Sequence, residues 1–137
     1  MPDKDLVIKK LSEVLKQLKS IKELSKLSER ALITDESKLY LAERVMERLI
    51  GAAIDINMHL ASDIKKSVPE DYYSSFIFLA KMRLMPMSLA KKLAPSAGRR
   101  NILVHEYQEL DIKKFKAALK KALADYTRYV QYIQRAL

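Results

Sequence analysis

Apolar residues recur every three or four positions over most of this chain, which is the spacing of one face of an α-helix. The first stripe predicts an amphipathic helix over residues 5–30 with a lysine-rich opposite face. Its apolar positions are Val7, Leu11, Val14, Leu18 and Ile21. The pattern therefore begins with a helix that buries one side and exposes the other.

A second stripe predicts a helix that Thr34 or Asp35 caps and that runs to about Lys66. Its apolar positions are Leu41, Val45, Leu49, Ala52, Ile56 and Leu60. Further apolar residues fall on another face of the same helix: Ile50, Ala53, Ile54 and Met58. Because a single intramolecular stripe does not need them, we expect a second packing partner, with another copy of the chain as the economical candidate.

Prolines divide the rest of the chain. Pro69 ends the second helix, a third begins at Glu70 to Asp71, and Pro86 interrupts it before helical spacing resumes at Met87. A last helix from about Asp111 to the C-terminus carries one apolar side, formed by Phe115, Leu119, Ala122, Tyr126, Tyr129 and Ile133. The pattern predicts an all-α fold, an antiparallel up-and-down bundle of four to five helices in one domain, residues 1–137.

Composition narrows the chemistry. The chain has 137 residues and no cysteine, which excludes disulfides, thiol nucleophiles and cysteine zinc sites. No apolar run resembles a signal peptide or approaches the roughly 18 residues that span a bilayer, so we expect a cytoplasmic protein with no membrane partner. The net charge of +9 favours a polyanionic partner, although many lysines on helix faces serve solubility alone.

The candidate chemistry lies in one octapeptide, Arg100-Asn101-Ile102-Leu103-Val104-His105-Glu106-Tyr107. An imidazole moves a proton near neutral pH, and a guanidinium is a fixed cation. Cleavage of a phosphodiester without a metal requires these two groups. Arg100 and His105 are therefore the candidate catalytic pair.

Helical phase constrains this pair. Five residues of a regular helix turn through about 500°, so Arg100 and His105 diverge by roughly 140°, whereas Asn101 and His105 share a face. The two side chains can meet in one of three ways: either the backbone is distorted near Gly98, or the Arg100 side chain wraps round the helix, or two motifs face each other across a dimer cleft. We favour the dimer cleft, with Asn101 orienting the imidazole or holding a phosphate.

These residues resemble a known family. The segment from Gly98 to Gln108, followed by Asp111, resembles the Arg-x4-His-x-Tyr signature of the HepT-like toxins (DUF86 family) in the HEPN superfamily. Glu43-Arg44, the run from Ala52 to Ile56 and His59 resemble the second helix of that family. The length and the order of helices agree across nearly the whole chain.

The resemblance implies a HEPN-like domain that is a metal-independent endoribonuclease without a cofactor. It implies the toxin of a type VII-like toxin–antitoxin module, a homodimer whose antitoxin is a minimal nucleotidyltransferase. In related systems that enzyme adds AMP to the motif tyrosine, which corresponds to Tyr107. Such a group adds bulk and negative charge beside a cationic phosphate site and would block RNA.

In this reading His105 accepts the proton of a ribose 2′-hydroxyl and Arg100 stabilises the pentacoordinate phosphorus, which leaves a 2′,3′-cyclic phosphate. The reaction requires RNA, because DNA lacks the attacking hydroxyl. The general acid is either the histidine of the partner subunit or water. Arg99 fits a phosphate contact and an ordinary exposed arginine equally well.

Several features have alternative interpretations. Asp55 and His59 share a helix face, but two ligands are too few for a metal site, so we expect a hydrogen-bonded pair. Tyr126, Tyr129 and Tyr132 could stack on bases, but core packing is the better interpretation. Two other function classes stay open: a non-catalytic subunit that binds substrate or nucleotide for a two-chain nucleotidyltransferase, and a structural helical adaptor.

Overall fold

The computed structural model describes residues 4–65, 69–99 and 109–137, and every regular element in these ranges is a helix. The seven helices are α1 (Lys4–Leu24), α2 (Glu29–Thr34), α3 (Glu36–Lys65), α4 (Tyr72–Lys81), α5 (Met87–Leu93), α6 (Ser96–Arg99) and α7 (Glu109–Ala136). The predicted all-α class is confirmed. Across the described ranges, no helix is both long and apolar enough to cross a membrane.

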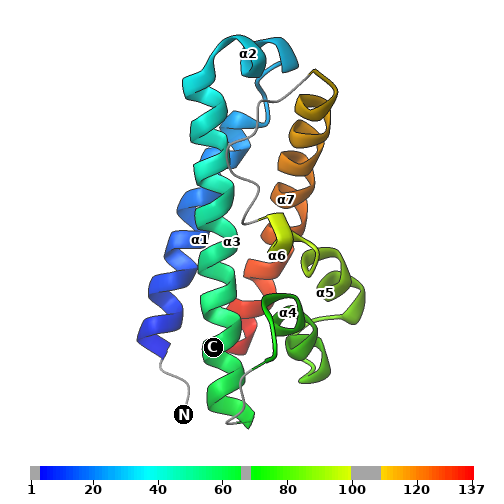
Figure 1. Cartoon of the computed structure of the whole chain (residues 1–137). Coiled ribbons are helices and arrows are strands. Elements are labelled where there is room, and N and C mark those ends of the chain that lie inside the picture. Colours follow the sequence, from blue (N-terminus) through cyan, green and yellow to red (C-terminus); the bar gives the residue numbers. More distant parts are fainter. Residues whose placement is uncertain (1–3, 66–68, 100–108) are drawn as a thin grey trace.

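Three long helices form the body of the bundle (Figure 1). α1 packs against α3 and α7, α2 lies across one end, and α4, α5 and α6 pack together beside α3 and α7. Lys10, early in α1, pairs with Asp55 in the second half of α3, so these two helices run in opposite directions. Ile112 and Leu39, near the starts of α7 and α3, share one cluster, so those two helices run the same way.

Most of the predicted stripes are buried. The α1 stripe from Val7 to Ile21 forms one side of the core, as predicted. Leu41 is an exception, because its side chain is 53% exposed. The additional apolar residues of α3 also differ from the prediction, which gave them a second copy of the chain as partner. Ile50, Ala53 and Ile54 are instead buried within the chain. α3 has α1 on one side and α4 and α6 on another, so the argument that these residues need a second copy is wrong.

Three helix boundaries differ from the prediction. α1 ends at Leu24 rather than Arg30, and a separate helix, α2, begins where the Ser28 hydroxyl accepts a hydrogen bond from the Ala31 N–H at 3.0 Å. Serine at an N-cap satisfies a backbone donor that the helix itself cannot pair. The pattern alone missed this cap because apolar spacing continues on both sides of it.

The second difference lies before Pro86, because α4 ends at Lys81 rather than at the proline, and Arg83 between them has a positive φ of 61°. The third difference lies before Pro95. α5 ends at Leu93 and α6 starts at Ser96, because proline has no N–H to continue the ladder. In the last turn of α5, the carbonyl of Lys92 accepts a hydrogen bond from the Lys121 Nζ at 3.0 Å, and the same ammonium contacts the Asp125 carboxylate at 2.8 Å. α5 is thus tied to α7 where its own hydrogen bonding stops.

Candidate functional site

The octapeptide predicted to carry the chemistry lies between α6 and α7. Arg100, Asn101, His105 and Tyr107 fall outside the described residues, and Arg99 closes α6 with its backbone. The structure therefore defines the two helix ends between which the motif stands.

A buried hydroxyl pair fixes α6 to α7. Ser96 Oγ donates to the Leu93 carbonyl at 2.6 Å and lies 2.6 Å from the Tyr126 hydroxyl. Because the single Ser96 proton is used on Leu93, the Tyr126 hydroxyl donates to Ser96. Both residues are buried, so the chain that leads into the motif is held against the middle of α7.

The chain leaving the motif is fixed at another point. Ile112, in the first turns of α7, is fully buried and packs with Leu32 of α2 and Leu39 of α3. Burying such a side chain contributes about 1.5–3 kcal/mol. Ile112 and Tyr126 are separated by about 21 Å along α7 at 1.5 Å per residue. Along the sequence, the motif is thus bracketed by two anchors on different parts of α7.

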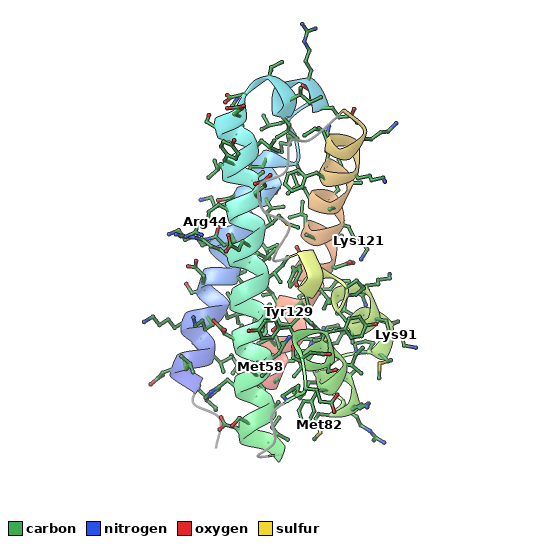
Figure 2. The ribbon with its side chains drawn as sticks, viewed as in Figure 1. Arg44, Met58, Met82, Lys91, Lys121 and Tyr129 are labelled. Atoms are coloured by element: carbon green, nitrogen blue, oxygen red, sulfur yellow. The ribbon has the colours of Figure 1, made fainter. Side chains whose placement is uncertain are left out.

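A second buried polar cluster joins α3, α4 and α7. The Tyr129 hydroxyl lies 2.6 Å from Asn57 Oδ1 and 3.1 Å from the Ala53 carbonyl. Figure 2 labels the position of Tyr129 in the bundle. Asn57 Nδ2 donates to Ser75 Oγ at 3.2 Å, and Ser75 Oγ donates to the Tyr72 carbonyl at 2.7 Å. The cluster satisfies polar groups that are fully buried, so it holds the bundle together.

Burial sets the ionisation of this cluster. Desolvation, with a smaller electrostatic contribution from Tyr126, raises the pKa of Tyr129 well above 10.0. The rings of Tyr126 and Tyr129 pack edge to face with Phe76. The interpretation of Tyr126 and Tyr129 as core residues is therefore confirmed, and Tyr132 packs against the same core while partly exposed.

The predicted pair of Asp55 and His59 is wrong. Asp55 Oδ2 lies 3.0 Å from the Nζ of Lys10, and His59 Nε2 lies 3.0 Å from Asp63 Oδ2. A lysine from α1 reaches the edge of α3 where Asp55 stands, and sequence spacing within α3 cannot show a partner on another helix. In the part of the chain that the structure describes, no three metal-ligating side chains gather.

Sequence analysis named Glu43 only for the family resemblance and did not predict its burial. Glu43 is 5% exposed and occupies a position of the apolar face of α3, four residues after Leu39 and three before Met46. A buried carboxylate is costly unless other groups compensate its charge, so such a residue is a candidate for a functional role. The signal in the sequence is a glutamate that falls in phase with an apolar stripe.

Most of the chain is similar in sequence to proteins described as HepT nucleases. Residues 14–133 match the family model described as ribonuclease HepT-like. The chain is 33% identical over 128 residues to a tRNA nuclease HepT from Aphanizomenon flos-aquae, covering 93% of this chain and 87% of that protein. It is 27% identical over 134 residues to an mRNA nuclease HepT from Shewanella oneidensis, covering 95% of this chain and 97% of that protein.

Solved structures share the fold. A chain of a mutant toxin–antitoxin MntA–HpeT structure superposes with a TM-score of 0.85 at 24% identity, covering 96% of this chain and 98% of that one. The tri-AMPylated Shewanella oneidensis HEPN toxin, in complex with its MNT antitoxin, superposes with a TM-score of 0.82 at 25% identity, covering 98% and 99%. The expected HEPN-type bundle is confirmed.

Proposed function

Because the chain belongs to the ribonuclease HepT-like family, we propose that it is an endoribonuclease acting as the toxin of a two-protein module. The antitoxin of this module is a minimal nucleotidyltransferase. The observation that carries the proposal is the family match over residues 14–133, which includes the segment from Arg100 to Tyr107. Residues 1–137 constitute a single domain in this proposal.

The substrate is RNA. The two relatives named as nucleases act on tRNA and on mRNA, and the chemistry that these substrates share is the ribose 2′-hydroxyl. The net charge of +9 supports binding of a polyanion. Arg99 is a candidate contact to a phosphate beside the cleaved bond.

His105 acts as general base in the cleavage step. It takes the proton of the 2′-hydroxyl, the 2′-oxygen bonds to the adjacent phosphorus, and the bond to the 5′-oxygen breaks. The leaving oxygen receives a proton, and the products end in a 2′,3′-cyclic phosphate and a 5′-hydroxyl. Arg100 stabilises the charge on the phosphorus oxygens, and Asn101 orients the imidazole.

The antitoxin silences the site through Tyr107. In the proposed reaction its phenol oxygen attacks the α-phosphorus of ATP in the nucleotidyltransferase, pyrophosphate leaves, and the phenol proton passes to a base. The AMP group brings negative charge next to Arg100 and His105, so it repels and obstructs RNA. The AMPylated state of the Shewanella relative supports this mode of control.

Two copies form a homodimer in this proposal. The helical phase of Arg100 and His105 supports a cleft shared by two motifs. Each copy then contributes an imidazole, which gives the reaction a base from one and a general acid from the other.

Cleavage by the purified chain tests the catalytic assignment. A short RNA should be cut to a cyclic-phosphate terminus, and the activity should fall by at least 100-fold in His105→Ala. His59→Ala is the matched control, since the chain has only two histidines and His59 stands on α3. Cleavage that persists in His105→Ala, or cleavage of the same oligonucleotide with 2′-deoxyribose throughout, contradicts the mechanism.

Co-expression with a candidate nucleotidyltransferase tests the control. The intact mass should rise by whole AMP groups, and Tyr107→Phe should abolish the rise. Tyr73→Phe, at a tyrosine that is 48% exposed, should leave it unchanged. An unshifted mass while the partner is active and bound counts against Tyr107.

A further inference from the structure

The charge of this chain is divided unevenly along its length. Residues 1–71 hold thirteen Lys or Arg and thirteen Asp or Glu, whereas residues 72–137 hold thirteen Lys or Arg and only four Asp or Glu. The whole net charge of +9 therefore belongs to the second part of the chain, which contains α4 to α7. Lysines that serve solubility alone do not need this separation, since mixed signs keep a surface soluble and a field of one sign repels itself.

Six of these cations lie on α5 and along one side of α7. On α7 they recur at every seventh position, a spacing that keeps them on one side of the helix over about 31 Å. α5 packs against α7 and adds two more that are adjacent in sequence. All six are exposed, and together they form the α5–α7 cationic face: Lys91, Lys92, Lys114, Lys121, Arg128 and Arg135.

Contacts of Lys121 join the two helices of this face. Its ammonium donates to the Lys92 carbonyl at 3.0 Å and to the Asp125 carboxylate at 2.8 Å. Asp125 is the one acidic residue in the sequence from 112 to 137, and this ion pair compensates its charge. The cations of α5 and α7 therefore lie next to each other without an exposed carboxylate between Lys92 and Lys121.

The other cations of α7 are available to a ligand. Within the ranges that the structure describes, Lys114 and Arg128 take part in no ion pair. The Arg135 guanidinium lies 5.1 Å from the centre of the Tyr132 ring, a cation–π contact that orients it and leaves its N–H donors free to bind. The face thus offers several cations at successive turns of one helix.

α5 connects this face to the helix that leads into the motif. It packs against both α7 and α6, and Ser96 of α6 is held to Tyr126 of α7 through two hydroxyl oxygens 2.6 Å apart. Figure 2 shows Lys91 and Lys121 on the same side of the bundle, opposite to Arg44. A strand that lies on the face therefore reaches the start of the motif by crossing α5.

We propose that the α5–α7 cationic face binds the sugar–phosphate backbone of the substrate RNA on its way to the motif. The inference rests on the proposed function and adds a binding surface that the octapeptide does not contain. Tyr126 and Tyr129 are buried and do not stack on bases from α7. The face therefore contacts phosphates, which position the RNA independently of its sequence, and its contribution weakens as salt rises.

Removal of three charges tests the face by direct binding. Lys91→Gln, Lys114→Gln and Arg128→Gln are combined in a chain that also carries His105→Ala, so that a fluorescently labelled tRNA transcript stays intact during the measurement. Lys121 is kept because it ties α5 to α7. At about 0.1 M salt the Kd should rise at least ten-fold over that of His105→Ala alone. The slope of log Kd against log salt should fall by about 2–3, since each phosphate contact contributes about 0.9.

A matched variant on α1 controls for the loss of net charge. Lys16→Gln, Lys19→Gln and Lys22→Gln remove the same three charges at exposed positions of a helix that packs on α3 and α7. In the His105→Ala chain this variant should keep the Kd within about three-fold and nearly the same salt slope. Equal weakening by the α1 variant, or an unchanged Kd in the α5–α7 variant, overturns the proposal.

Exchange of one cation for another separates charge from folding. Lys91→Arg, Lys114→Arg and Arg128→Lys change the same three positions and should bind the transcript as tightly as the parent chain, because phosphate contacts accept either cation. In the active chain the three glutamine substitutions should raise KM and leave kcat within about two-fold, since the reacting groups belong to the motif. A fall in kcat at unchanged KM contradicts a role in binding.

The outcomes separate this inference from the proposed function. RNA cleavage by the wild type, together with unaltered binding by the glutamine variant, refutes the face and leaves the endoribonuclease standing. Binding that the glutamine variant loses, in a chain whose wild type cuts no RNA, supports the face and overturns the endoribonuclease. If the chain with His105→Ala does not bind the transcript even at low salt, the face is overturned.

Discussion

Removal of one hydroxyl should measure how strongly the buried cluster of α3, α4 and α7 holds the bundle. Tyr129→Phe keeps the ring and its packing against Phe76 and deletes the donor that lies 2.6 Å from Asn57 Oδ1. The substitution leaves a buried acceptor without that donor. A lost hydrogen bond with such an acceptor costs about 1–3 kcal/mol.

The entropy of unfolding relates this loss of stability to a fall in the melting temperature, Tm. At roughly 2.1 cal/mol/K per residue, a chain of 137 residues loses about 3.5 °C of Tm per kcal/mol, so Tm should fall by about 4–10 °C. Thermal unfolding followed by circular dichroism at one protein concentration measures it. Tyr132→Phe, at a partly exposed tyrosine of the same helix, should change Tm by less than about 2 °C.

The same variant carries a pH signature. The pKa of Tyr129 is raised in the folded state, so its contribution to stability is complete below about pH 10 and declines as the unfolded chain ionises above it. The free energy of unfolding should therefore fall more steeply above pH 10 in the wild type than in Tyr129→Phe. Equal Tm values for the wild type and Tyr129→Phe, together with parallel pH profiles, would refute the reasoning.

Three further predictions concern the ends of helices. Ser28→Ala should lower the free energy of unfolding by about 1 kcal/mol in urea denaturation, because α2 loses its N-cap bond to Ala31. Asp71 accepts a hydrogen bond from the Ser74 N–H at 2.7 Å, which lowers the pKa of its carboxyl group. The contribution of this carboxylate to the free energy of unfolding is present above its usual pKa and is lost as the pH falls. Asp71→Asn should therefore flatten the acid limb of the profile of stability against pH. Ile112→Ala should cost about 2–5 kcal/mol, and hydrogen exchange should report the loss first in the opening turns of α7; uniform protection along α7 would contradict that anchor.

Local signals explain what the sequence predicted well. Asp71 and Pro86 mark the starts of α4 and α5, since a capping carboxylate and the fixed φ of a proline act within one turn of the backbone. The α1 stripe is buried as predicted because a helix with one apolar face has only one way to cover it. The octapeptide carries its chemistry in the order of its residues, and that order supported the family before any geometry was known.

Contacts between helices explain what the sequence missed. Apolar spacing could not show that Ile50 and Ile54 are covered by the chain's own later helices while Leu41 is left outside. It paired Asp55 with His59, because the competing Lys10 lies 45 positions earlier in the chain and reaches α3 only after folding. Glu43 shows the same limit, since burial of a carboxylate depends on what packs over it.

The sequence by itself determined the helices, the chemistry available to the motif and the family, because these depend on backbone propensity and on the identity and spacing of residues. The tertiary structure decided which faces of α3 are inside and how Ser96 and Ile112 hold the two helix ends that bracket the motif. Burial is a property of contacts between segments far apart in the chain, so it is settled only when those segments pack.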